Sequence, residues 1–73
     1  MIYPELITPV VGQTYHNRAG GDYRCTQVLD SERAVMVRHH DCWTLVAHGV
    51  RQYPNGDIEW GWSSGGHWPD SGG

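Results

Sequence analysis

Apolar and polar residues alternate over short stretches along most of this chain, and no long stretch repeats apolar residues at helical spacing. Short runs rich in Val, Thr, Tyr and Trp and separated by turn residues are typical of antiparallel strands. The runs with this pattern are residues 10–16, 23–29, 34–39, 42–50 and 58–60. They predict an all-β fold: a small five-stranded antiparallel barrel, SH3-like or OB-like in type, or a strongly bent sheet.

Turn sequences stand between these runs. The strongest is Asn55-Gly56, because both residues tolerate the positive φ that a tight hairpin turn requires. Within the run 42–50, Gly49 predicts a bulge or a corner. The other predicted turns and connections are residues 17–22, 30–33 and 40–41.

The run 42–50 is the most apolar of the five. Its alternation places Trp43, Leu45 and Ala47 on one face of a strand, and we expect that face to belong to the core. Trp43 and Trp60 are therefore predicted to be the large rings of a small β core, since a ring of this size buries roughly 150–250 Å².

A chain of this length is expected to form one domain over residues 1–73. Residues 1–9 are interpreted as a lead-in segment whose two prolines limit regular structure, with Ile2, Leu6 or Ile7 packing on the core. Residues 10–60 form the predicted β meander. Residues 61–73 are rich in Gly, Ser and Trp, and we expect them to be irregular and to fray at residues 70–73.

The formal net charge is −3, and all five basic residues are Arg. A basic patch is missing, which disfavours binding of long nucleic acid. No apolar run approaches the about 20 residues that span a bilayer, and residues 1–5 lack the pattern of a signal peptide. We therefore expect a cytoplasmic protein with no membrane partner, in which Cys25 and Cys42 are free thiols.

The eight aromatic residues are four Trp and four Tyr, with no Phe. Each of these side chains has an N–H or O–H group that needs a hydrogen-bond partner. Such residues therefore suit the edge of a core, where the polar group reaches water, and also a binding surface. Trp62 and Trp68 lie in the Gly-rich segment, where the sequence leaves open whether they cap the core or face a partner. Exposed Trp and Tyr side chains near an Arg can bind a protein or stack on a nucleobase. The candidate binding residues are Trp62, Trp68, Tyr53, Arg51 and His67.

The sequence gives less support for a catalytic site or a metal site than for a binding surface. His39 and His40 are adjacent and would point to opposite faces of an extended chain, and the spacing of His and Cys does not match a zinc site. Cys42 follows His40 and Asp41, but consecutive residues rarely form a nucleophile–base pair. We therefore expect a non-enzymatic protein with no catalytic residues, no metal site and no cofactor.

Three motifs together resemble a family of small, uncharacterised phage and prophage proteins. They are G-x-T-Y-x-N-R-x-G-G-x-Y-R-C from Gly12, W-T-x-x-A-H-G from Trp43 and Y-x-x-G-x-I-E-W from Tyr53. The resemblance spans about residues 12–67. It departs at Asp41-Cys42, where the family has Ser-Gly, and this departure weakens any special role for Cys42.

The resemblance implies a phage or mobile-element protein, and proteins of this class and size often inhibit host defence systems. We therefore expect a binding protein that acts on a host protein by direct contact. A small protein that sequesters a signalling nucleotide is one alternative, and a minor virion component is another. A homo-oligomer would fit so small a core, because association buries further surface.

Overall fold

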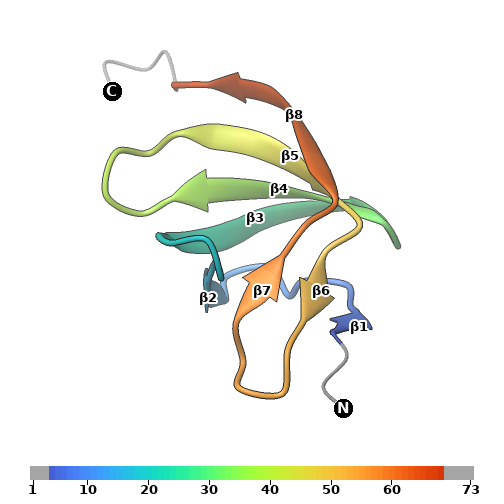
Figure 1. Cartoon of the computed structure of the whole chain (residues 1–73). Helices are drawn as coiled ribbons and strands as arrows, with labels where there is room; N and C mark the ends of the chain where they lie inside the picture. Colours follow the sequence, from blue (N-terminus) through green and yellow to red (C-terminus); the bar gives the residue numbers. More distant parts are fainter. Residues whose placement is uncertain (1–3, 69–73) are drawn as a thin grey trace.

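The structure is a computed structural model that describes residues 4–68. These residues form no helix and fold into two antiparallel sheets (Figure 1). The larger sheet has the strand order β2-β3-β4-β5-β8 and the smaller one β1-β6-β7. The strands of the larger sheet are β2 (Thr14–His16), β3 (Asp22–Asp30), β4 (Arg33–Arg38), β5 (Thr44–His48) and β8 (Trp62–His67). Those of the smaller sheet are β1 (Glu5–Leu6), β6 (Arg51–Gln52) and β7 (Ile58–Glu59).

The all-β prediction is confirmed, but the sheets do not close into a barrel. β2 and β8 lie at opposite edges of the larger sheet and do not pair with each other. A single parallel bridge between Asn17 and Ile58 connects the two sheets on the β2 side. The fold is therefore a pair of sheets with an open edge at β8, which forms the upper rim in Figure 1.

One long bent hairpin supplies strands to both sheets. Its two arms pair as β5 with β8 in the larger sheet and as β6 with β7 in the smaller one. The first arm turns the corner at Gly49, whose φ of +67° favours glycine, as the sequence predicted. The second arm turns at Gly61, whose N–H donates to the carbonyl of His48 at 2.9 Å. At the tip, the predicted Asn55-Gly56 turn forms between β6 and β7.

The core lies between the sheets. In the register of β4 and β5, Ala34 faces Ala47 and Met36 faces Leu45, and all four side chains are buried. The largest fully buried side chains are Met36 and Ile58 rather than Trp. The buried apolar set is Tyr23, Cys25, Ala34, Met36, Leu45, Ala47, Val50 and Ile58.

Trp43 and Trp60 pack against this core, as expected, but both remain partly exposed. Trp60 meets Tyr23 edge to face, with the ring centroids 4.9 Å apart. Each indole therefore packs on the core while part of its surface stays exposed. Trp suits such a position because its ring is apolar and its N–H can bond to a partner at the surface, which Phe cannot do.

Several sequence predictions about secondary structure were wrong. Of the run 42–50, only Thr44–His48 is strand. Residues 10–13 are not strand: Val10 and Val11 are exposed, Gly12 has a φ of +90°, and pairing begins only at Thr14. The lead-in segment contains a strand that was not predicted, β1, which pairs with β6. The expected packing of this segment on the core is confirmed for Ile7, whereas Leu6 is exposed.

A further error concerns the segment expected to be irregular. Residues 62–67 form β8, although Ser and Gly are poor strand formers, because they pair with β5. The expected fraying of residues 70–73, and the expected packing of Ile2, lie outside the described residues.

Candidate binding surface

β8 is an open sheet edge with an unusual composition. Its sequence, Trp-Ser-Ser-Gly-Gly-His, contains no Lys, Arg, Asp, Glu or Pro, and all six residues are exposed. Natural proteins commonly protect such edges with charged side chains or Pro, because unpaired N–H and C=O groups attract other strands. Within residues 4–68, no strand pairs with the outer side of β8. Its protection is limited to a register shift against β5 and a φ of +70° at Gly65.

Trp62 opens β8 and has 61% of its surface exposed. Its ring stacks on the His48 imidazole with the centroids 3.6 Å apart and the planes 10° from parallel. His48 is itself held by a 3.0 Å hydrogen bond between Nε2 and the Ser64 hydroxyl. The indole is therefore fixed from one side and open on the other, and little side-chain entropy is left to lose on binding.

Trp68 follows the other end of β8 and has 59% of its surface exposed. It meets Trp43 edge to face, with the centroids 4.4 Å apart. Gly66 makes room for this pair, since a Cβ there would lie 2.5 Å from Cζ2 of Trp43. His67 bonds within its own strand, with Nδ1 2.5 Å from the carbonyl of Gly65. The two exposed indoles thus frame β8, and each rests on a second ring.

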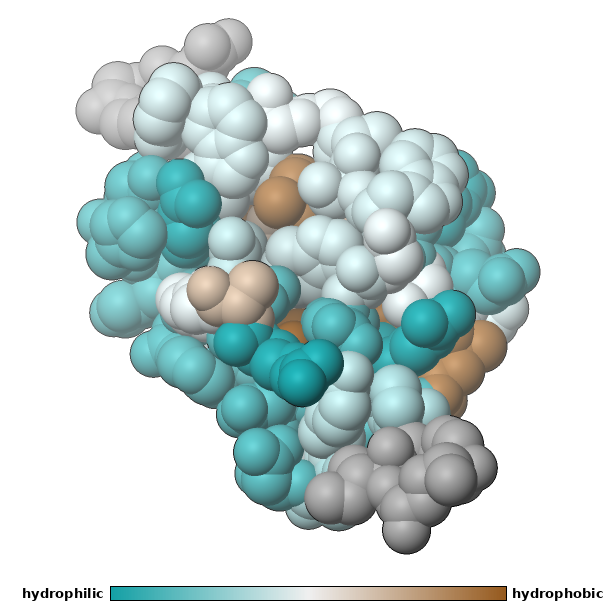
Figure 2. All heavy atoms as spheres, viewed as in Figure 1, coloured by the Kyte–Doolittle hydropathy of each residue, from teal (hydrophilic) through white to brown (hydrophobic). Residues whose placement is uncertain are grey.

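Figure 2 shows the same face of the molecule with all atoms drawn. Brown, hydrophobic atoms lie at the bottom of a hollow between paler side chains in the upper half of the view, where β5 and β8 run in Figure 1. Apolar surface next to an open edge is typical of an interaction site.

Arg51 lies on the same part of the surface as Trp62. Both line a cavity of about 400 Å³ at the corner where β5 turns into β6. The residues around it are Asp30, Glu32, Arg33, His48, Gly49, Arg51, Gly61 and Trp62.

Tyr53, by contrast, belongs to a polar network at the base of the hairpin tip. Its hydroxyl donates to Glu59 Oε1 at 2.5 Å and accepts from Nη1 of Arg18 at 2.9 Å. The Arg18 guanidinium lies 4.7 Å from the centre of the Tyr53 ring. The hydrogen bond to the Glu59 carboxylate raises the pKa of the Tyr53 phenol. Tyr53 lines a different cavity from Trp62, and the two cavities share no residue.

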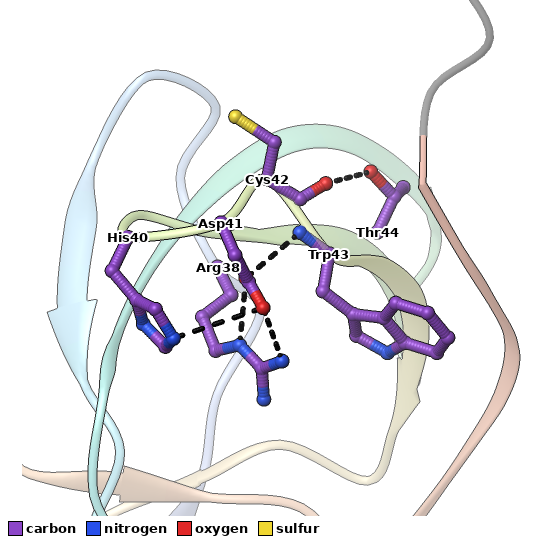
Figure 3. Close-up of polar contacts among 6 residues, drawn as sticks. All are labelled: Arg38, His40, Asp41, Cys42, Trp43 and Thr44. Carbon is purple, nitrogen blue, oxygen red and sulfur yellow. Dashed lines mark hydrogen bonds and ion pairs between the residues drawn. The ribbon is translucent and has the colours of Figure 1, made fainter. Parts of the chain in front are cut away.

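A second polar cluster was not predicted from the sequence. The Asp41 carboxylate accepts two hydrogen bonds from Arg38, at 2.9 Å from Nε and 2.6 Å from Nη2, and a third from the N–H of Trp43 (Figure 3). This pairing with Arg38 holds the pKa of Asp41 well below its usual range. The cluster fixes the loop between β4 and β5 and thereby the position of Trp43. The Arg-x-x-Asp spacing across a turn was the one local signal that could have indicated it.

Cys42 has an unusual backbone conformation. Its φ of 61° is in the left-handed region, which favours glycine. In Figure 3 the thiol points away from Asp41, whose carboxylate is engaged by Arg38 and lies 3.7 Å from His40. Cys42 is an exposed free thiol and Cys25 a buried one.

The Arg38–Asp41 pair predicts a specific dependence of stability on pH. Because the folded state lowers the pKa of Asp41, the pair contributes stability above the ordinary carboxyl pKa of about 3.9 and loses it as the pH falls through the folded value. Asp41→Asn should therefore lower Tm at pH 7 and flatten the fall of Tm between about pH 4 and pH 2. Thermal unfolding followed by circular dichroism across this range measures both effects.

Asp57→Asn is the matched control, since Asp57 forms no ion pair within residues 4–68. Asp57→Asn should leave the fall of Tm between about pH 4 and pH 2 as steep as in the wild type. An Asp41→Asn profile as steep as that of the wild type would contradict the assignment.

Within residues 4–68, no three His, Cys, Asp or Glu side chains come together as a metal site, and no helix has the length and apolarity to cross a bilayer. Comparison with family models, with curated proteins and with solved structures found no match to this chain. The geometry therefore defines a class only: a small all-β protein with an open, Trp-framed sheet edge.

Proposed function

We propose that this is a non-enzymatic binding protein of a phage or mobile element that inhibits a host defence protein by direct contact through β8. The observation that carries the proposal is the uncharged, fully exposed edge strand between Trp62 and Trp68. The motif resemblance over about residues 12–67 supports the phage context.

Strand addition is the mode of binding that this edge favours. An extended segment of the partner would pair with β8 through main-chain hydrogen bonds, which supply affinity with little dependence on sequence. Trp62 and Trp68 would supply anchors on either side, since Trp is enriched among the residues that dominate binding energy at interfaces. His67 lies between them on the same edge and Arg51 beside Trp62, whereas Tyr53 braces the hairpin tip.

Affinity capture from a host lysate tests this mode. Ser63 is exposed on β8, and Ser63→Lys places a charge on the edge of the kind that natural proteins use to prevent strand pairing. The variant should keep its melting temperature and lose most of the captured partner. Thr26→Lys adds the same charge at an exposed position of β3, away from β8, and should capture as the wild type does.

A phage plating assay in host cells tests the inhibitory role. Expression of the wild type in a host with an active defence system should raise phage plating efficiency, and Ser63→Lys should not. Equal capture and equal plating by the wild type and Ser63→Lys would contradict binding at β8. Full plating protection with no captured protein would contradict inhibition by protein contact.

A further inference from the structure

The cavity beside Trp62 is built from three segments that are distant in sequence. They are the β3–β4 turn (30–33), the corner after β5 (48–51) and the start of the second arm (61–62). Two backbone hydrogen bonds hold them together: the Gly49 N–H donates to the Glu32 carbonyl at 2.8 Å, and the Gly61 N–H to the His48 carbonyl at 2.9 Å. Its volume of about 400 Å³ falls within the range of small-molecule sites, roughly 300–1,000 Å³.

One wall of this cavity is an ordered aromatic plane. Trp62 is stacked on His48 on one side and is 61% exposed. A planar ring that enters the cavity can stack on the open face of the indole. Stacking of a nucleobase on an aromatic side chain is a recurring source of affinity and does not depend on the identity of the base.

The charged groups of the cavity divide into a paired set and an unpaired set. The Asp30 carboxylate accepts from Nε of Arg33 at 2.7 Å and from the Glu32 N–H at 2.8 Å, so its charge is balanced within the turn. Arg51 and Glu32 form no ion pair within residues 4–68. A free guanidinium matches phosphate, and a free carboxylate accepts from N–H donors.

We propose that this cavity binds a guanine nucleotide, with the base on Trp62, the phosphate on Arg51 and the base edge on Glu32. Guanine presents two donors on one edge, N1–H and the N2 amino group, and these match the two oxygens of a carboxylate. Adenine presents an acceptor nitrogen at position 1, which the carboxylate repels. The site overlaps the proposed β8 interface at Trp62, but it does not use the unpaired backbone groups of β8.

Titration calorimetry and Trp fluorescence with GMP, guanosine, AMP and inorganic phosphate test the site. GMP should bind one to one and more tightly than the other three. Trp62→Leu should weaken GMP binding at least about tenfold, the effect expected from loss of one stacked base. Arg51→Gln should reduce the affinity for GMP to that for guanosine, and Glu32→Gln should remove the preference for GMP over AMP.

Arg24→Gln is the matched control, because Arg24 is exposed on β3 and does not line this cavity. It should bind GMP as the wild type does, and circular dichroism shows whether each variant is folded. The proposal is overturned by absence of GMP binding at millimolar concentration, by equal affinity for GMP and AMP, or by phosphate binding as tight as that of GMP. Ser63→Lys should still bind GMP, which separates failure here from failure of the β8 interface.

Discussion

Ile58→Ala is expected to lower the free energy of unfolding by about 2–5 kcal/mol, the range for large-to-small substitutions in cores. Ile58 is fully buried and is one of the largest side chains to be so. Ile58 also links the two sheets through its backbone. It forms a parallel β-bridge with Asn17, and its carbonyl accepts a hydrogen bond from the Arg18 N–H at 2.7 Å. A cavity at this junction would weaken packing on both sides at once.

The expected loss for Ile58→Ala is large relative to the total free energy of unfolding of so small a domain. The core of a domain of this size rarely supplies more than about 3–5 kcal/mol, so the variant should be substantially unfolded at 37 °C. Urea unfolding at 25 °C measures the change, with Leu6→Ala as the control. Leu6 is 58% exposed, and its truncation should change stability by no more than about 0.5 kcal/mol. Comparable, small effects at both positions would show that Ile58 is not a core residue in solution.

Local signals account for the part of the fold that the sequence predicted. The 30–33 hairpin and the Asn55-Gly56 turn form where turn residues separate strand-like runs. The alternation around Leu45 and Ala47 correctly identified the inward face of β5. Gly49 is at the predicted corner because only a residue that tolerates positive φ continues the chain there.

The sequence predicted candidate binding residues but not the sheet edge that joins them, because pairing between distant segments creates that edge. Residues 62–67 have low strand propensity and become β8 only because β5 lies beside them. The stack of Trp62 on His48 follows from that register, in which the two residues are directly opposite. Of the five candidate residues, Trp62 and Arg51 line one cavity, His67 and Trp68 lie at the far end of β8, and Tyr53 lies in a separate network.

Trp43→Ala is expected to cost about 3 kcal/mol, the lower end of the range for Trp truncation in cores. The ring packs against the core but is only partly buried, and it also supports Trp68 and covers Gly66. Its loss removes the contact that joins the end of β8 to the core. Thermal and urea unfolding measure the change, and an unaltered melting point would show that the ring is not part of the packed structure.

Trp68→Ala should differ from Trp43→Ala in both stability and binding. Trp68 is 59% exposed, so its truncation should remove only the edge-to-face contact with Trp43, about 0.5–1.5 kcal/mol, while partner capture falls strongly. In the Trp43→Ala background that small cost should disappear, because the contact is already lost. If Trp68→Ala instead destabilises the fold as much as Trp43→Ala does and leaves capture unchanged, Trp68 is a cap on the core, and β8 keeps only Trp62 as an anchor.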